Sequence, residues 1–272
     1  MGTWDPAKND YVSIKQENIL WAVDAIDKFL QVWRDHPALY AIEAANEPWD
    51  KRLDVLKDYY RTVREHMKKV APHLKFVFYA AGEFSGANWN DLFPDDDCDN
   101  VIMDKHNYNA WWDTQPKISD YCDKAGDGWK DLMAVAQEIK YPVWIGEWSL
   151  ATDVCAMWLG GFNDNSFHYV QECDWVECPK SYLPDDVAVD FDRSAPELGP
   201  TGNNLSSSPK YGKCPTDSKY WSPDDMQTLG QCILEAFNDN VEAQFMWTFR
   251  TELEPRWEYS ASYDNGWIKQ SK

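Results

Sequence analysis

The apolar residues of the chain follow two alternating patterns. Between residues 14 and 35, apolar side chains recur every three or four positions, at Ile19, Val23, Ile26 and Leu30, which is the spacing of one helix face. Short, almost continuous apolar runs follow such segments and are typical of strands buried on both sides. The pattern predicts helices near 14–35, 52–70, 132–139 and 222–237, and strands near 39–45, 76–80, 101–103, 143–146 and 242–249.

Two of these helices have capping signals at their starts. Ser13 and Gln16 have the spacing of a capping box, in which two side chains satisfy backbone amides of the first turn. Ser222 followed by Pro223 predicts an N-cap and a first helical residue, because proline there loses no hydrogen bond. We expect both helices to begin at these residues.

Alternating strands and helices predict parallel strands joined by right-handed crossovers, in either a closed barrel or an open sheet. Polar or aromatic residues lie near the carboxyl ends of several predicted strands, at Glu47, His106, Glu147 and Trp247. Barrel enzymes carry their active sites at this end. No glycine-rich phosphate-binding motif follows any predicted strand. We therefore predict an α/β fold, a (β/α)8 barrel of the TIM type.

The predicted strands number five and begin at residue 39, whereas a closed barrel of this type has eight. Either the chain is an N-terminally incomplete barrel or strands come from outside it, and we favour the first interpretation. Residues 1–272 would then form a single domain. A long irregular insertion is expected at about 160–221, where Pro, Asp, Ser, Asn and Gly are frequent.

Composition narrows the choice of partner. An excess of Asp and Glu gives a formal charge of −20, which disfavours nucleic acid and anionic lipid. No apolar run approaches the ~20 residues of a membrane helix, and Met1 to Pro6 show no secretion-signal pattern. The 16 Trp residues exceed the needs of a packed core of this size. Their flat faces suit the apolar faces of sugar rings, so neutral carbohydrate is the expected partner.

Cysteine usage predicts disulfides rather than a metal site, because no pair has Cys-x-x-Cys spacing. The odd number leaves at least one thiol outside any intrachain disulfide. Asn204 begins a glycosylation sequon, which agrees with a secretory route and an extracellular or cell-surface location. The seven cysteines are Cys98, Cys122, Cys155, Cys173, Cys178, Cys214 and Cys232.

Four motifs at the predicted strand ends resemble glycoside hydrolase family 5, the large cellulase family of retaining barrel enzymes. They are Ala44–Pro48 (AANEP), Asp104–Tyr108 (DKHNY), Trp144–Ser149 (WIGEWS) and Phe245–Phe249 (FMWTF), the last followed by Thr251-Glu252.

The segment after the third motif, Thr152–Leu159 (TDVCAMWL), is similar to the exo-β-1,3-glucanase subgroup of that family. The resemblance covers about residues 14–160 and 222–268. It implies an enzyme that hydrolyses β-glucan, most closely an exo-acting glucan 1,3-β-glucosidase. Two carboxyl groups suffice for this chemistry, so no cofactor is expected.

The resemblance also implies roles for individual residues. Glu47 would be the general acid and base, and Glu147 the nucleophile that forms a glycosyl-enzyme. Asn46 would hydrogen-bond the 2-hydroxyl of the sugar. Tyr108 would hold Glu147 through its hydroxyl, with His106 beside it.

Two aromatic residues complete the implied site. Trp247 would form the floor under the non-reducing sugar, and Trp111 would belong to an aromatic clamp at the pocket entrance.

Other functions remain open from the sequence. Endo-β-1,4-glucanase or mannanase activity would need an open groove in place of a blocked pocket. A non-catalytic glucan-binding barrel would retain the aromatic platform without turnover, but the presence of both glutamates argues against it. A structural cell-wall domain would leave the four motifs unexplained. We expect a monomer.

Overall fold

The computed structural model describes nine stretches of the chain, and they fall into two compact units. The first unit comprises residues 1–106, 129–146 and 237–244, and the second comprises 107–128, 147–236 and 245–272. Each unit is described by itself. The described stretches are 3–5, 10–12, 15–48, 53–80, 86–111, 115–122, 127–152, 221–250 and 255–269.

A five-stranded sheet has the order β3-β4-β5-β6-β7, so neighbouring strands follow one another in the sequence. β3, β4 and β5 are parallel, with Ala41 opposite Lys75 and Phe76 opposite Val101. The parallel pairing confirms the crossover topology expected from the alternating pattern. The strands are β3 (Ala41–Glu43), β4 (Lys75–Tyr79), β5 (Val101–Asn107), β6 (Val143–Trp148) and β7 (Ala243–Met246).

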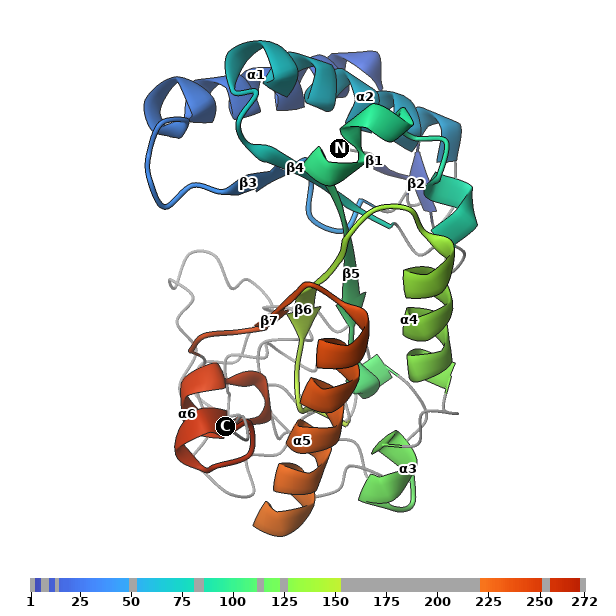
Figure 1. Cartoon of the computed structure of the whole chain (residues 1–272), viewed down its shortest axis with the longest axis vertical. Helices are drawn as coiled ribbons and strands as arrows, with labels where there is room; N and C mark the ends of the chain where they lie inside the picture. Colours follow the sequence, from blue (N-terminus) through green and yellow to red (C-terminus); the bar gives the residue numbers. More distant parts are fainter. Residues whose placement is uncertain are drawn as a thin grey trace, which may run out of the picture. The chain divides into compact units, whose positions relative to one another are not determined.

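The core of the first unit lies between β4 and two long helices, α1 (Gln16–Trp33) and α2 (Leu53–Val70) (Figure 1). β4 is buried along nearly its whole length, as expected of a parallel strand covered on both faces. Most of α4 (Asp127–Glu138) also belongs to this unit. Two 3-10 helices, η1 (Gly86–Trp89) and η2 (Asp95–Asn100), lie between β4 and β5 in the sequence.

Two tyrosines of α2 fasten the helix to the strand ends. Tyr60 donates its hydroxyl to the carbonyl of Tyr79 over 2.8 Å, and Tyr59 donates to the carbonyl of Ala44 over 2.5 Å. Burial raises the pKa of both hydroxyl groups well above the usual value, so both remain donors at ordinary pH. Because Ala44 lies just before Asn46-Glu47, this contact positions the loop that carries the first predicted catalytic residue.

Helix α1 has apolar residues on two faces. Ile19 and Leu30 face the core, whereas Trp21 and Val32, on the other side, are 72% and 69% exposed. Exposed apolar side chains that recur along one helix face form a patch that favours association.

None of the helices in the described part of the chain is long and apolar enough to cross a membrane.

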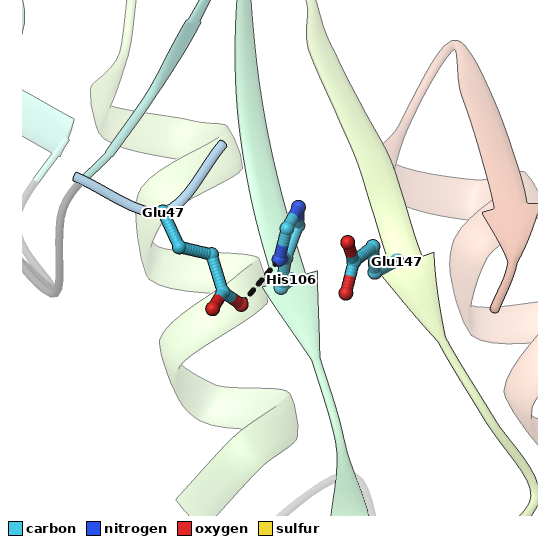
Figure 2. Close-up of side chains that lie close together, drawn as sticks. All are labelled: Glu47, His106 and Glu147. Carbon is cyan, nitrogen blue, oxygen red and sulfur yellow. Dashed lines mark hydrogen bonds and ion pairs between the residues drawn. The ribbon is translucent and has the colours of Figure 1, made fainter. Parts of the chain in front are cut away.

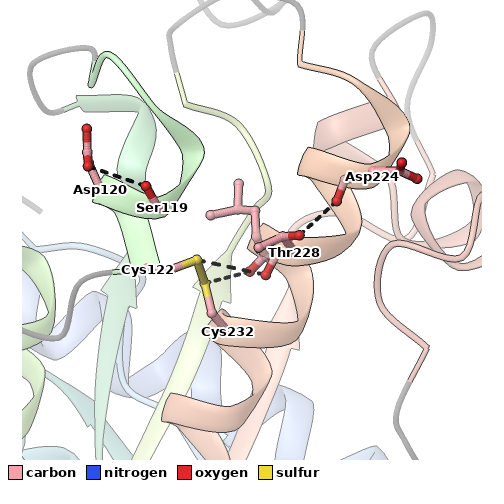
Figure 3. The surroundings of a disulfide bond; sticks show 7 residues. Ser119, Asp120, Cys122, Asp224, Thr228 and Cys232 are labelled. Atoms are coloured by element: carbon pink, nitrogen blue, oxygen red, sulfur yellow. Dashed lines mark hydrogen bonds between the residues drawn. A yellow bond between two sulfur atoms is a disulfide. The ribbon is translucent and has the colours of Figure 1, made fainter.

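In its described residues, the second unit contains three α-helices: α3 (Ile118–Cys122), most of α5 (Pro223–Asn240) and α6 (Tyr259–Asp264). A disulfide between Cys122 and Cys232 joins α3 to α5, as Figure 3 shows. This confirms the expectation of disulfides. Two short 3-10 helices, η3 (Asn109–Trp111) and η4 (Pro255–Trp257), also belong to this unit.

One of the two capping predictions is confirmed. The amide of Asp225 donates to Oγ of Ser222 over 3.1 Å, and the amide of Ser222 donates to the Asp225 carboxylate over 3.3 Å, so α5 begins with a capping box. The prediction for α1 is wrong, because Lys15 is its N-cap and makes no capping side-chain bond. Ser13 lies outside the described residues.

The strand boundaries differ from the predictions at both ends of the chain. β7 ends at Met246 instead of residue 249, because the amide of Thr248 bonds the carbonyl of Trp257 rather than a neighbouring strand. An antiparallel hairpin of β1 (Thr3–Asp5) and β2 (Asp10–Val12) was not predicted. Its strands are shorter than the four to eight residues on which an apolar pattern becomes visible. Most of the predicted insertion lies outside the described residues.

Candidate active site

Glu47 follows β3 in the first unit, and its backbone has an uncommon conformation. Its φ angle is +40°, in the left-handed region that non-glycine residues rarely occupy. Such a conformation persists only where neighbouring contacts hold it, and it is often found at functional sites. Three residues before Glu47, the amide of Ala44 donates to the carbonyl of Val77 over 3.0 Å and anchors the start of this loop to β4.

The carboxyl group of Glu47 meets the imidazole of His106. Oε1 of Glu47 lies 2.6 Å from Nδ1 of His106, as Figure 2 shows. The side chain of His106 is 3% exposed and that of Glu47 is 35% exposed, so the pair reaches solvent through the carboxyl group. The ring of Tyr79 packs against the imidazole, with 4.7 Å between ring centroids.

The other ring nitrogen of His106 faces a second carboxylate. Nε2 lies 3.2 Å from Oδ2 of Asp104, which precedes His106 by two residues and so lies on the same face of β5. Oδ1 of Asp104 accepts the backbone amide of Gly146 over 2.6 Å. A Cβ atom on Gly146 would collide with the Asp104 carboxylate, which explains why glycine stands at this position.

In the second unit, Tyr108 donates its hydroxyl to Oε2 of Glu147 over 2.6 Å. Glu147 lies on β6, which Figure 2 also draws. The ring of Tyr108 packs on Trp257 with 5.3 Å between centroids, and both belong to a small apolar cluster with Ala110 and Ala151. This packing fixes the direction of the Tyr108 hydroxyl.

Trp247 presents its indole ring at the surface of the second unit. The residue is 42% exposed, and its ring meets Trp257 edge-on at 5.7 Å. The amide of Trp247 donates to the carbonyl of Trp148 over 2.8 Å, which keeps the residue beside β6 although β7 has ended. A half-exposed indole held at its backbone and edge offers a flat apolar face to a ligand.

The structure therefore joins four of the seven predicted residues in two hydrogen-bonded pairs, one in each unit: Glu47 with His106, and Tyr108 with Glu147. Asn46, the fifth, is exposed next to Glu47. Trp247 is the sixth. The last, Trp111, ends η3, and its side chain lies outside the described residues.

Sequence reasoning missed two residues that contact the predicted site residues: Asp104, beside His106, and Trp257, beside Tyr108. Asp104 lies inside a quoted motif, and its spacing of two residues from His106 on a strand was an available signal. Trp257 ends η4, after β7 in the sequence, and no motif marks it. Neither shows in a pattern of apolar residues.

The two glutamates differ in what surrounds them. Glu147 accepts a hydrogen bond from the hydroxyl group of Tyr108. Glu47 contacts Nδ1 of the His106 imidazole at 2.6 Å. The two carboxyl groups therefore have different partners, an imidazole for Glu47 and a phenolic hydroxyl group for Glu147.

The model of the family described as Cellulase (glycosyl hydrolase family 5) matches residues 3–173, more than half of the chain. The chain belongs to glycosyl hydrolase family 5. This confirms the resemblance seen in the motifs. The barrel fold predicted from the sequence is the fold of the family, and the described sheet supplies five of its strands.

Two curated relatives carry the name "Probable glucan 1,3-beta-glucosidase A". The protein from Aspergillus terreus is 31% identical over 126 residues, which cover 44% of this chain and 29% of the relative. The protein from Neosartorya fischeri is 27% identical over 238 residues, 83% of this chain and 47% of the relative. The chain therefore spans less than half the length of these relatives.

Two solved structures share the fold. The rutinosidase from Aspergillus niger aligns with a TM-score of 0.55 at 16% identity, over 95% of this chain and 60% of its own. The protein called AoRut aligns with a TM-score of 0.58 at 15% identity, over 98% of this chain and 63% of its own.

Proposed function

We propose that this chain is a retaining β-glycosidase that hydrolyses β-glucan, acting from the non-reducing end of β-1,3-glucan. The observation that carries the proposal is the contrast between the two strand-end glutamates. Glu147 accepts a hydroxyl hydrogen bond from Tyr108, and Glu47 shares a short contact with His106. Hydrolysis with retention needs one carboxylate and one carboxylic acid in these roles.

In the first step, Glu147 attacks the anomeric carbon while Glu47 transfers its proton to the glycosidic oxygen. The bond from the anomeric carbon to the leaving sugar breaks, and a glycosyl-enzyme ester forms. In the second step, Glu47 takes a proton from water, and the water oxygen displaces Glu147 from the anomeric carbon. The product keeps the β configuration.

Two further residues, Trp247 and Asn46, would bind the sugar in this scheme. The exposed face of Trp247 would stack beneath the ring at the non-reducing end, and Asn46 would hydrogen-bond its 2-hydroxyl. Family membership supports the reaction class, and the names of the two curated relatives support β-1,3-glucan as substrate. Endo action on β-1,4-glucan or mannan is the alternative within the family.

The disulfide supports a place for this activity outside the cell or at its surface, because disulfides persist in oxidising compartments. The exposed aromatic residues and the formal charge of −20 favour a neutral polysaccharide over an anionic one as partner.

The test is glucose release from a laminarin-type β-1,3-glucan, with the anomer of the first product followed by NMR. We expect β-glucose to appear first and turnover to be lost in both Glu47→Gln and Glu147→Gln. Glu235→Gln, at an exposed position of α5, is the matched control and should keep full activity. First appearance of α-glucose would overturn retention. A folded chain that binds laminarin without turnover would instead identify a glucan-binding barrel.

A further inference from the structure

The carboxylate of Asp104 is almost completely buried and has two partners. Its side chain is 4% exposed, and that of His106 is 3% exposed. Oδ1 accepts the Gly146 amide over 2.6 Å, while Oδ2 faces Nε2 of His106 at 3.2 Å. The backbone amide therefore fixes the rotation of the carboxylate and leaves one defined oxygen for the imidazole.

We propose that Asp104 is a positioning residue for the general acid: through His106 it selects the tautomer that allows Glu47 to keep its proton. The proposal rests on the proposed function for the role of Glu47. Asp104 does not touch the substrate in this scheme, and it acts only through His106.

The hydrogens on the His106 ring depend on what each neighbouring carboxyl group can accept or donate. An ionised Asp104 can only accept, so Nε2 of His106 carries a hydrogen and donates it to Oδ2. Nδ1 then has two possible states. It accepts a proton from a neutral Glu47 carboxyl group, or it donates one to an ionised Glu47 while the ring is positively charged. Both states hold the same number of protons, so one proton is shared along the 2.6 Å contact between Oε1 and Nδ1.

Replacing Asp104 with asparagine removes the charge and keeps the shape of the side chain. The change moves the hydrogen of the neutral His106 ring from Nε2 to Nδ1. In Asp104→Asn, the side-chain carbonyl can still accept the Gly146 amide, and the NH2 group then points to Nε2 of His106. Nε2 must become an acceptor, so the hydrogen of the neutral ring moves to Nδ1 and points to Glu47. Glu47 is then held as an ionised acceptor and has no proton to give. An Asp→Asn change in the Ser-His-Asp triad acts in the same way, through the wrong tautomer.

Substrates that differ in leaving group provide the kinetic test. For an aryl β-glucoside whose phenol is weakly acidic, cleavage needs protonation, and Asp104→Asn should lower kcat/KM by about 10²–10⁴-fold. For 2,4-dinitrophenyl β-glucoside, cleavage needs no proton, and kcat/KM should change little. Asp264→Asn, at an exposed position of α6, is the control and should leave both rates unchanged. An equal fall on both substrates, or a fall on neither, would overturn the proposal.

A second measurement is independent of activity. The ¹⁵N shifts of the His106 ring report which nitrogen carries the hydrogen, and the signal is assigned by its loss in His106→Gln. Hydrogen on Nε2 in the wild type, and on Nδ1 in Asp104→Asn, is the expected result. If the wild type shows a neutral ring with its hydrogen on Nδ1, the proposal fails, whether or not the variant folds. If the wild type lacks hydrolytic activity, the proposed function fails, while this measurement still decides whether Asp104 sets the tautomer of His106.

Discussion

The hydroxyl of Tyr108 lies 2.6 Å from Oε2 of Glu147, and packing of the Tyr108 ring on Trp257 holds it there. A hydrogen bond to an ionised group contributes about 1.5–3 kcal/mol. In the proposed reaction, this bond orients the nucleophile and stabilises its charge before attack.

Tyr108→Phe should therefore lower kcat/KM by roughly 10- to 100-fold, since it removes the oriented hydrogen bond and leaves the ring packing in place. The rate is measured with 2,4-dinitrophenyl β-glucoside, for which nucleophilic attack by Glu147 does not wait on proton transfer. Tyr263→Phe removes a hydroxyl group from a half-exposed tyrosine of α6 and should change nothing. Full activity in Tyr108→Phe would show that the bond is not used.

The disulfide between Cys122 and Cys232 closes a loop with a sequence separation of 110 residues. A crosslink over such a separation restricts the unfolded chain and stabilises a protein by about 2–5 kcal/mol. The double variant Cys122→Ser/Cys232→Ser should lower the free energy of unfolding by that amount. Urea denaturation without reductant, followed by tryptophan fluorescence, measures it, and an unchanged midpoint would contradict the expectation.

The buried carboxylate of Asp97 predicts a pH dependence of stability. Burial alone would raise the pKa of Asp97, but hydrogen bonds from Arg64 (3.0 and 2.6 Å) and the ammonium group of Lys68 (3.0 Å) outweigh burial and hold it below its usual value. A lowered folded-state pKa gives stability that is present above about pH 4 and is lost as pH falls through the folded-state value.

Asp97→Asn should accordingly cost about 3–5 kcal/mol at pH 7, because it leaves the buried Arg64 guanidinium uncompensated. The cost should shrink as the pH is lowered below about 4. Denaturation of both proteins at pH 7, 4 and 3 checks this. Asp58→Asn, which breaks an exposed pair with Arg61, should cost less than about 1 kcal/mol at every pH. A constant difference for Asp97→Asn would refute the assignment.

Gly230 of α5 is a position at which we expect glycine to stabilise the protein more than alanine does. In an exposed helix, Gly→Ala stabilises by about 1 kcal/mol. At this position of α5, an added Cβ would collide with the backbone carbonyl of Trp267. Gly230→Ala should therefore destabilise, by about 1–3 kcal/mol, since backbone must shift to admit the methyl group. Gln231→Ala, at the exposed neighbouring position, should be nearly neutral, and thermal unfolding ranks the two variants.

The places of Glu47 and Glu147 at strand ends were predictable, because each comes at the end of a short apolar run. Glu47 follows β3 and Glu147 lies within β6, and a charged residue in such a place is rarely a packing residue. The helix periodicity of α2 and α5 was equally visible, because their buried faces repeat every three or four residues.

Other features depend on information that the local sequence lacks. Seven cysteines allow many pairings, so the partner of Cys122 could not be derived from spacing. The end of β7 depends on a backbone bond between Thr248 and Trp257, which tertiary structure alone provides. Asp104 was quoted only as part of a motif, because its hydrogen bond with the Gly146 amide joins residues far apart in the sequence.

The fit between Asp104 and Gly146 also restricts how the sequence can change. A methyl group on Gly146 and the carboxylate of Asp104 cannot occupy the same space. Gly146→Ala alone meets this barrier, so a smaller residue must replace Asp104 first. That replacement would itself remove a partner of His106. Position 146 can therefore change only after position 104, which lies 42 residues away, and a library that varies Gly146 alone will recover glycine.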